Sequence, residues 1–498
     1  MSKIPDLKAQ VMSQAKSHSL GRYIWECGIG PQLGYSFSKI HSLAYSFIGF
    51  QTAFISTNWN SVYWDTACLV VNSGSLENEG SLKAKSADYA KMAKAIGDIR
   101  TRGTAVSLIN INESDYGFKP DATQNQILFG LNAISNISPE VVEKIISGRP
   151  YASFKDFLIR CPLTKTAMLN LIKGGAFDGL DKNFKTRVRI MVYYISLISE
   201  PKKRLTLQNF SGLVQRGLLP KELELQLRFF NFNAYLKKNK VGKYYTFDDA
   251  CISFFDRFLS EEVEFLDIIN GVTCIKQEIW DKIYKKLMNP AREYLKENQA
   301  EMLKTYNKAL FHEQWDKYAA GGISKWEMEA LCFYYHEHEL ARVDKNRYGI
   351  VNFNSLSEEP AIDYTFKRGG RDIPIYKLSK IIGTVIAKID TKSIVVLLTT
   401  EGVVNVKFAR EYYAMFKKQI SDIDPTTGSK KVVEKGWFGR GNMLMITGFR
   451  RDDTFVAKTY TATQSHQLYK ITDVLNGDIK LTHERWTSDT SQEEDYEY

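Results

Sequence analysis

Hydrophobic side chains recur at helical spacing between residues 35 and 55. At about 100° per residue, one face of the predicted helix is apolar except for one glutamine, and the opposite face carries small side chains. The first face holds Ala44, Phe47, Ile48, Gln51 and Ile55, and the second holds Ser42, Ser46, Gly49 and Ala53. This pattern fits a helix buried on both sides, and it also fits a helix whose small face admits a second helix or a nucleic-acid backbone. The periodicity does not separate the two interpretations.

The amino-terminal end of this predicted helix is basic. Ser38 is able to cap the helix by accepting a backbone N–H bond, which places Lys39 and His41 in the first turn. Unpaired amides and the positive end of the helix dipole lie beside them, so the pattern predicts a place for phosphate. The alternative is a structural lysine at the cap of a buried helix.

From about residue 186 to 345 the spacing is again helical, and then the pattern changes. Between about residues 376 and 475, β-branched residues alternate in three strands, followed by a short helix at residues 411–420 and two further strands. That order is typical of the oligonucleotide-binding (OB) barrel. The sequence therefore predicts a multidomain protein that is mainly α-helical at first and ends in an all-β OB-fold barrel.

Composition narrows the class of protein. The 498 residues suffice for about two to four domains, and 44% hydrophobic residues supply ordinary cores. A formal charge of +10, a pI near 9.0 and 13% aromatic residues suit a polyanionic partner whose bases stack. The six cysteines form no CxxC pair, and the sequence has no signal peptide and no apolar run of about 18 residues. We therefore expect a cytoplasmic protein with reduced thiols, no zinc site and no place in a membrane.

The stretch that begins at Gly34 resembles the fingers segment of the bacterial replicative DNA polymerase III alpha subunit, a C-family polymerase. The family pattern is approximately GYxFNKSHxxAYxxxxYQTAYLK, and the matching residues are Gly34, Tyr35, Phe37, Lys39, His41, Ala44, Tyr45, Gln51, Thr52 and Ala53. The departures are Ser38, Ile40 and Ser56, and the last of them replaces a second lysine. The resemblance implies a nucleotide-binding role for Lys39, His41, Ser42, Tyr45 and Gln51.

Two later stretches resemble the same family. Residues 108–118 are similar to its PPDINxSxxxF stretch, and the sequence that follows residue 128 is similar to its helix–hairpin–helix element. In such elements a glycine-rich hairpin presents backbone amides to a DNA phosphate. The first hairpin has lost its lysine and glycines, which are replaced by Ser135, Asn136 and Ser138. The second turn keeps them, so the predicted DNA contacts are Lys173, Gly174 and Gly175.

Two short strings each allow two interpretations. QLRFF resembles the glutamine-led clamp-binding peptide of this polymerase, and the alternative is an ordinary core segment. The residues concerned are Gln226, Leu227, Phe229 and Phe230. The string CFYYHEHEL, residues 332–340, contains two His and two Glu that suggest a metal, but ligands at i and i+2 of a helix diverge. It also resembles the family's GFYxSGHPL, so we interpret it as a linker and predict no metal site.

The predicted barrel supplies candidate contacts to single-stranded nucleic acid. OB barrels present aromatic and basic side chains of strands and loops to such strands, and the family places a barrel after the same linker. The candidates are Lys388, Lys392, Lys407, Phe408, Arg410, Arg450, Arg451 and Tyr460. A purely structural small barrel is the alternative.

Nucleotide addition requires paired carboxylates that hold two magnesium ions. The family keeps these carboxylates on its palm, upstream of the fingers, and the resemblance begins here at the fingers. Asp422 and Asp424 imitate the palm motif, but they lie in a predicted loop of the barrel, so we interpret them as a chance match. The expectation is that this chain carries no catalytic residue and that Mg²⁺ is held by palm carboxylates of another chain.

The resulting hypothesis is the C-terminal part of a bacterial or phage replicative DNA polymerase. Its expected divisions are fingers (1–120), a helix–hairpin–helix DNA-binding region (121–190), a helical linker (191–375), an OB fold (376–475) and an acidic tail (476–498). The expected partners are primer-template DNA, deoxynucleoside triphosphates and a palm-bearing chain, with a sliding clamp as a further candidate. Alone, the chain should bind DNA in the bacterial or host cytosol without extending a primer. The competing hypothesis is a non-catalytic DNA-binding or processivity factor with the same domains.

Overall fold

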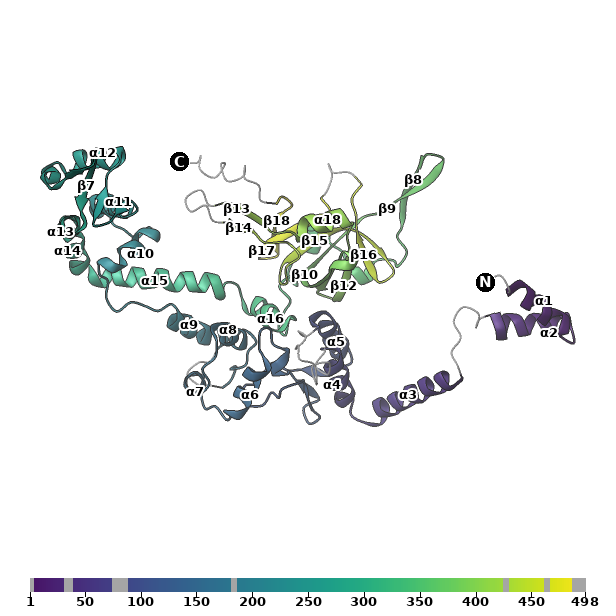
Figure 1. Ribbon diagram of the computed structural model, residues 1–498. Coiled ribbons are helices and arrows are strands. Elements are labelled where there is room, and N and C mark those ends of the chain that lie inside the picture. The colour runs from purple at the N-terminus through teal and green to yellow at the C-terminus, as the bar shows by residue number, and fades with distance from the viewer. Residues whose placement is uncertain are drawn as a thin grey trace. The chain divides into compact units, whose positions relative to one another are not determined.

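The computed structural model describes residues 4–30, 39–73, 88–180, 186–423, 430–460 and 466–485 (Figure 1). The chain forms two compact units. The first comprises Met1–Ser107 and Ser114–Ala133, and the second comprises Leu108–Glu113 and Ile134–Tyr498. Most of the predicted acidic tail, residues 486–498, lies outside the described residues.

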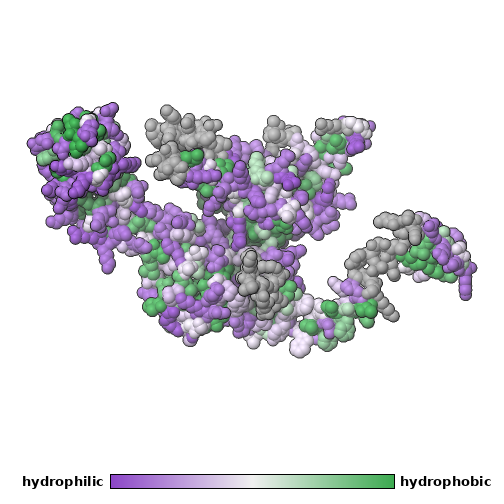
Figure 2. All heavy atoms as spheres, viewed as in Figure 1, coloured by the Kyte–Doolittle hydropathy of each residue, from purple (hydrophilic) through white to green (hydrophobic). Residues whose placement is uncertain are grey.

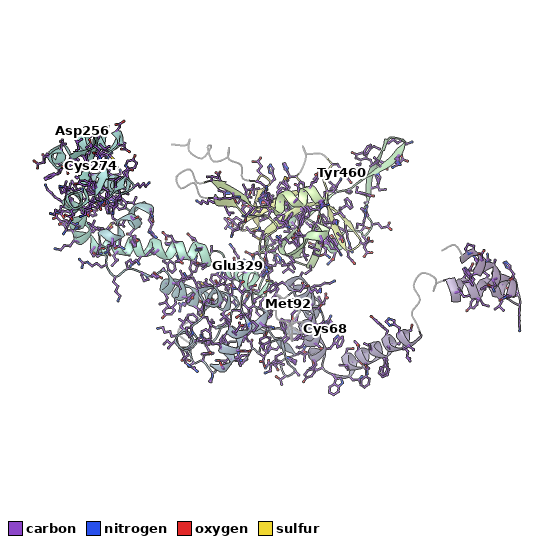
Figure 3. The ribbon with its side chains drawn as sticks, viewed as in Figure 1. Cys68, Met92, Asp256, Cys274, Glu329 and Tyr460 are labelled. Carbon is purple, nitrogen blue, oxygen red and sulfur yellow. The ribbon has the colours of Figure 1, made fainter. Side chains whose placement is uncertain are left out.

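The first unit is helical apart from one small sheet. Its helical segments are α1 (Ile4–Gln14), α2 (His18–Tyr23), the π-helix η1 (Ile24–Ile29), α3 (Lys39–Asn58), α4 (Ser61–Asn72), α5 (Tyr89–Thr101) and the 3-10 turn η4 (Leu131–Ala133). Helices α4 and α5 pack together through buried side chains that include Val62, Leu69, Met92, Ile96 and Ile99. Figure 3 labels Met92 at this contact and Cys68 on α4.

A buried carboxylate organises the end of α5. Asp65 is only 1% exposed, and it accepts hydrogen bonds from Arg102 at 2.5 Å and from the Thr104 hydroxyl at 2.8 Å. Because a buried charge is costly unless it is paired, this contact fixes the end of α5 against α4. Thr104 leads directly into β1 (Ala105–Val106), which pairs in parallel with β3 (Gln126–Leu128), and β3 pairs antiparallel with β2 (Lys119–Asp121). Burial raises the pKa of the neighbouring Cys68 thiol, and the Asp65 charge raises it further.

The second unit begins with helices that form the helix–hairpin–helix region. These are α6 (Pro139–Ser147), α7 (Phe154–Arg160), α8 (Lys165–Lys173) and α9 (Arg187–Ile198). Pro139 stands in the first turn of α6 and Gly148 is its C-cap, which is the order in which these residues favour the start and the end of a helix. A cluster of aromatic rings packs these helices together, since Phe157 meets both Tyr151 and Phe177 with ring centroids 4.7 and 5.0 Å apart.

The next part of the second unit is not purely helical. It contains α10 (Phe210–Gln215), α11 (Glu224–Leu236), α12 (Asp249–Phe258), α13 (Gln277–Leu287), α14 (Asn289–Glu297), α15 (Gln299–Tyr318), α16 (Ile323–Leu331) and α17 (Lys345–Tyr348), with 3-10 turns η5 (Leu207–Asn209), η6 (Lys221–Leu223), η7 (Ser260–Phe265) and η8 (Phe353–Ser355). It also contains four strands in the order β4–β5–β7–β6, which are β4 (Lys240–Val241), β5 (Tyr244–Thr246), β6 (Asp267–Ile269) and β7 (Val272–Lys276). This sheet corrects the prediction of an all-helical stretch.

The sheet and its helices share one aromatic core. Trp280 is fully buried there, and its indole N–H donates to the Asn233 side chain at 3.0 Å. Phe232 stacks on Phe254 with ring centroids 4.1 Å apart. Cys274 of β7, labelled in Figure 3, is also buried. This part of the chain therefore has a core of its own.

The predicted OB barrel is confirmed. Its strands are β10 (Ser379–Ile389), β11 (Ile394–Thr399), β12 (Gly402–Lys407), β15 (Met443–Arg451) and β16 (Thr454–Ala457), with α18 (Arg410–Lys417) between the third and fourth. They pair in the order β10–β11–β12–β16–β15, and β15 pairs again with β10 to close the barrel. The β12–β16 pair is parallel and the other pairs are antiparallel. Multidomain architecture with α-helices first and the barrel afterwards is therefore correct.

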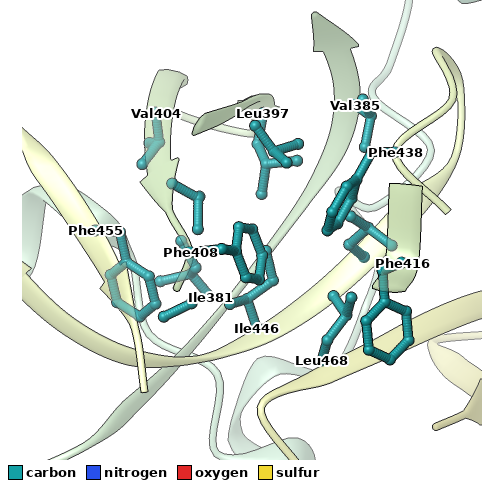
Figure 4. Packing of buried hydrophobic residues seen from close by; sticks show 14 of the residues in the cluster. Ile381, Val385, Leu397, Val404, Phe408, Phe416, Phe438, Ile446, Phe455 and Leu468 are labelled. Atoms are coloured by element: carbon teal, nitrogen blue, oxygen red, sulfur yellow. The ribbon is translucent and has the colours of Figure 1, made fainter. Parts of the chain in front are cut away.

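The alternating side chains of these strands fill the barrel. Figure 4 shows Ile381, Leu397, Val404, Ile446 and Phe455 pointing into one cluster. Gly448 of β15 is required at one crossing, because a Cβ there would overlap the carbonyl oxygen of Val456 on the neighbouring strand. Apolar burial thus determines which face of each strand points inward.

Three hairpins extend the barrel beyond the pattern that the sequence predicts. One precedes it, β8 (Ile362–Arg368) with β9 (Arg371–Tyr376). A second, β13 (Ile420–Ile423) with β14 (Lys430–Glu434), follows α18, which ends at Lys417 and not at residue 420. The third is β17 (Leu468–Leu475) with β18 (Asp478–Thr482), in which β17 pairs with β15 and β18 lies at the beginning of the region predicted as an acidic tail.

Candidate nucleic-acid interface

Helix α3 carries the residues predicted to bind a nucleotide. It begins at Lys39, directly after the predicted cap, and runs to Asn58, three residues beyond the stretch that the sequence predicts as helical. His41, Ser42, Tyr45 and Gln51 are all exposed, and the rings of His41 and Tyr45 lie 5.1 Å apart. The capping residue Ser38 and the side chain of Lys39 lie outside the described residues.

The apolar side chains of α3 are exposed on more than one face. Figure 2 shows hydrophobic side chains along the surface of this helix. Leu43, Phe47, Phe50 and Ile48 are each more than half exposed, and Phe54 is 52% exposed. The interpretation of α3 as a helix buried on both sides is therefore wrong for this chain, and the helix presents a large apolar surface to solvent.

The turn predicted to contact DNA lies inside the second unit. Lys173, Gly174 and Gly175 are buried, and Lys173 Nζ is 2.5 Å from a Glu329 carboxylate oxygen of α16 (Figure 3). The Lys173 carbonyl accepts a hydrogen bond from Arg187 at 3.0 Å. Gly175 adopts a φ of +82°, and its lack of a Cβ leaves room for the Arg187 guanidinium. Because these groups already have partners in the fold, the turn's placement does not support the prediction of a DNA contact.

Arg187 leads from this turn to a second buried carboxylate. Its guanidinium is 2.6 Å from Asp178 and 3.0 Å from Glu327, which is fully buried in α16. Glu327 also accepts hydrogen bonds from the backbone N–H groups of Tyr335 and His336 at 2.9 and 3.0 Å. The His336 ring lies 2.6 Å from the same carboxylate. These contacts join α9, α16 and the segment that follows α16.

The string CFYYHEHEL connects α16 to the barrel. His338 Nδ1 accepts a hydrogen bond from the Leu340 backbone, so the neutral ring donates from Nε2 to the Leu398 carbonyl at 3.0 Å. Burial lowers the pKa of His338 to about 4 and raises the pKa of Glu339. The Tyr334 hydroxyl lies 2.9 Å from the Thr384 hydroxyl in β10. His336 and His338 therefore face different partners, and this segment fastens the barrel to α16.

The glutamine-led string is part of helix α11. Gln226 and Phe229 are buried, whereas Leu227 and Phe230 are partly buried, and Phe230 packs against Phe210 with ring centroids 5.1 Å apart. A peptide that docks on another protein must be accessible, so this placement favours the core interpretation. It does not support clamp binding.

The barrel candidates divide into exposed and buried side chains. Lys388, Lys392, Lys407, Arg410 and Arg451 are exposed. Phe408 is only 2% exposed and packs in the barrel core, where its ring is 5.1 Å from Phe438 (Figure 4), so it is not a stacking surface for a base. Arg450 is held by the Leu356 carbonyl at 2.9 Å and by Glu358 at 3.2 Å, which gives it a structural role.

An aromatic and basic surface does form near the β15–β16 turn. The Arg451 guanidinium lies over the rings of Tyr376 and Phe449, 5.7 and 5.6 Å from their centroids. Tyr460 (Figure 3) accepts a hydrogen bond from the Tyr376 backbone at 2.9 Å, and Lys458 lies over the Tyr460 ring at 5.6 Å. The sequence prediction missed the aromatic residue Tyr376 and the basic residue Lys458, although each lies beside a predicted strand. We refer to Tyr376, Arg451, Lys458 and Tyr460 as the barrel platform.

A second basic group surrounds the β10–β11 turn. Lys407 at the end of β12 donates to the carbonyl of Lys392 in this turn, which brings these two lysines together at one end of the barrel. Asp390 in the same turn is engaged by the Tyr413 hydroxyl at 2.6 Å and by Lys417 at 2.9 Å, and these hydrogen bonds lower the pKa of its carboxyl group. The β10–β11 and β15–β16 turns are the loops that OB folds use for oligonucleotides.

The palm-like string lies in a hairpin. Asp422 belongs to β13 and pairs with Lys431 across the hairpin, while Asp424 lies outside the described residues. In the part of the chain that the structure describes, no three His, Cys, Asp or Glu side chains are grouped as a metal site requires.

The chain is similar to a helix–hairpin–helix motif family and to several DNA polymerases. The helix–hairpin–helix motif family matches residues 103–187. A probable DNA polymerase of Bacillus subtilis named YorL is 38% identical over 485 residues, which is 94% of this chain and 37% of that protein. A DNA-directed DNA polymerase of Bacillus phage SPbeta has the same identity and coverage. The DNA polymerase III subunit alpha of Borreliella burgdorferi is 34% identical over 179 residues, 34% of this chain and 14% of that protein.

The chain is related to bacterial and phage DNA polymerases. The resemblance to the DNA polymerase III alpha subunit and the presence of a helix–hairpin–helix element are thereby confirmed. The chain spans about 37% of the length of each of the two Bacillus proteins above.

Among the helices that the structure describes, none combines the length and the apolar character needed to cross a bilayer.

Proposed function

We propose that this chain supplies the nucleotide-facing helix and the DNA-binding domains of a template-directed DNA polymerase. The observation that carries the proposal is the similarity to DNA polymerases along 94% of the chain. In this proposal α3 contributes Lys39, His41, Ser42, Tyr45 and Gln51 to the deoxynucleoside triphosphate site. The exposure of the described side chains among them is compatible with that role.

The palm carboxylates are assigned to another polypeptide. Paired carboxylates that hold two Mg²⁺ ions would supply the activation of the primer hydroxyl. The described residues do not fit such a centre, so no metal-dependent step is assigned to them. The exposed apolar surface of α3 supports a partner polypeptide, because a helix that is apolar on several faces requires a cover. A sliding clamp remains a proposed partner without a docking segment in the described residues.

The barrel is proposed to hold the single-stranded template. Base stacking on aromatic side chains and contacts between cations and phosphates are the two interactions that OB folds use, and the barrel platform offers both. Tyr376 and Tyr460 would supply rings, and Arg451 and Lys458 would supply charge. The β10–β11 turn, with Lys388, Lys392 and Lys407, would continue the basic track.

Removing both platform cations is expected to weaken binding of a single-stranded thymidine 20-mer. With Arg451→Gln and Lys458→Gln together, we expect affinity to fall roughly tenfold at low salt and the salt dependence to become shallower by about 0.7 for each lost phosphate contact. Fluorescence anisotropy across a salt series measures both. The matched control is Lys418→Gln with Lys480→Gln, two exposed lysines elsewhere in the barrel domain. If the control variant loses as much affinity for the 20-mer, the effect is due to net charge, and the proposal that the platform binds single strands is rejected.

The proposed function is tested by mixing the purified chain with a palm-bearing polypeptide and measuring DNA synthesis. The purified chain alone is expected to bind primer-template DNA and to add no nucleotide, while addition of a palm-bearing polypeptide with Mg²⁺ restores synthesis. Primer extension resolved on a denaturing gel measures this. Extension by the single chain would overturn the assignment of the carboxylates. DNA binding without any synthesis on mixing would favour the non-catalytic DNA-binding or processivity factor.

The proposed place of action is the cytosol of a bacterium, including a host cell in the case of a phage protein. DNA and deoxynucleoside triphosphates are both present there.

A further inference from the structure

A surface pocket of about 380 Å³ lies in the second unit between the segment at residues 204–208 and helix α14. The α14 and α15 labels in Figure 1 locate it. Three of its lining side chains are cationic, namely Arg204, Arg292 and Lys296, and none of its lining residues is an aspartate or glutamate. No sequence motif drew attention to it, because its walls come from residues almost 90 positions apart.

The wall that carries Arg204 is held in place by two amide side chains of α15. Asn307 accepts a hydrogen bond from the Lys202 N–H at 2.8 Å and donates to the Lys202 carbonyl at 2.9 Å. Gln299, with its amide turned to satisfy both groups, pairs in the same way with the backbone of Leu205 at 2.9 and 3.1 Å. Two such paired contacts fix the backbone on both sides of Arg204, so the pocket is preorganised.

The opposite wall presents its cations on one side of a helix. Arg292 and Lys296 are four residues apart on α14 and therefore share a face. Arg292 donates to the Lys285 carbonyl at 2.9 Å and to the Asn289 side chain, which fixes its guanidinium. Arg204 and Lys296 are exposed, and in the described part of the chain neither forms an ion pair. Their charges are therefore available to a ligand.

The floor of the pocket is apolar. Leu205 and Leu295 both line it and are each 2% exposed. A low-dielectric floor strengthens the attraction between the surrounding cations and a bound anion. Guanidinium groups match the oxygens of phosphate in a two-pronged geometry, and an ammonium adds a point charge.

We propose that this pocket binds a phosphate group, either the phosphodiester of a DNA strand or the phosphate of a free nucleotide. Both ligands present the same tetrahedral anion to Arg204, Arg292 and Lys296. The site is separate from α3 and from the barrel platform, and it does not depend on the proposed synthesis. In the polymerase context it would anchor nucleic acid or a nucleotide on the helical region between the helix–hairpin–helix element and the barrel.

The test uses the full chain with Arg204→Gln and Lys296→Gln combined. Both side chains are exposed, so the fold should tolerate their loss, and an unchanged thermal unfolding midpoint checks this. One arm measures binding of a 20-base-pair DNA duplex by anisotropy over a salt series, and the other measures binding of dATP and of inorganic pyrophosphate by calorimetry. The matched control is Lys221→Gln with Lys282→Gln, two exposed lysines outside the pocket that remove the same charge.

A loss confined to the duplex arm, with affinity at least tenfold lower and a salt slope reduced by about 0.9, identifies a backbone phosphate. A loss confined to dATP and pyrophosphate identifies a free nucleotide. Charge reversal with Arg204→Glu should deepen either loss. The proposal is overturned if neither arm changes, if charge reversal has no further effect, or if the control variant loses as much. Failure of primer extension on mixing would leave this result standing, since binding is measured with this chain alone.

Discussion

Substitution of Phe50 and Phe54 by glutamate in α3 is expected to abolish assembly of this chain with the palm-bearing partner that we propose. The two rings lie one turn apart, with centroids 6.3 Å from each other, and both are more than half exposed. Where the partner covers Phe50 and Phe54, each glutamate places a charge in an apolar interface. Loss of one buried aromatic anchor costs about 2 kcal/mol or more, so two should weaken the complex by a factor of roughly 1,000. Size-exclusion chromatography of the mixture, together with primer extension, measures the loss.

The control for this prediction is Ile268→Glu with Leu475→Glu. Both positions are exposed apolar residues outside α3, at 76% and 66% exposure. The control should assemble and support synthesis, and neither double variant should change the thermal unfolding midpoint of the free chain. Normal assembly of the α3 variant would show that the partner does not use this surface.

Substitution of Glu327 by alanine is expected to destabilise the junction of α9, α16 and the following segment by about 3–5 kcal/mol. The carboxylate is fully buried and accepts hydrogen bonds from Arg187 at 3.0 Å and from two backbone N–H groups. Its removal leaves the buried Arg187 guanidinium with Asp178 and the Lys173 carbonyl as partners, and it takes from the Tyr335 and His336 amides the carboxylate that accepts from them. Hydrogen exchange at the amides of Tyr335 and His336 measures the change, because their protection depends directly on this carboxylate.

A surface ion pair provides the comparison. Glu313 lies 2.6 Å from Arg216 but is 45% exposed, so Glu313→Ala should cost no more than about 1 kcal/mol. Similar effects of the two substitutions would contradict the claim that burial makes the Glu327 contacts strong. The comparison is informative because both substitutions remove one carboxylate from a salt bridge with arginine, and the two carboxylates differ in burial.

The barrel was predictable because its longest strands are extended runs of β-branched and other apolar residues. Residues 379–389 and 443–451 cover eleven and nine positions, and six consecutive residues of each strand are buried. The sheet of β4–β7 was missed because its strands have only two to five residues, too few to separate a period of two from a helical one. Helix α3 was also predictable, but its surroundings were not.

The sequence predicted which side chains have the chemistry of a nucleic-acid site, but it did not predict which of them are exposed. Lys173, Arg450 and Phe408 have the side chains that nucleic-acid contacts require, yet the fold uses all three internally. Their partners are distant in sequence, since Lys173 pairs with Glu329 and Arg450 pairs with Glu358. A single sequence contains no local signal for such pairs.

The order of helices and barrel strands, the basic character and the relationship to DNA polymerases were thus determined by the sequence alone, because helical and strand periods and short motifs are local properties. Only the tertiary structure decided that α3 is uncovered, that Lys173 and Gln226 are buried, and that Tyr376, Arg451, Lys458 and Tyr460 meet on the barrel. It also decided that Arg204, Arg292 and Lys296 converge on one pocket. The physical reason is that exposure and convergence depend on packing between segments far apart in the chain, which no local pattern records.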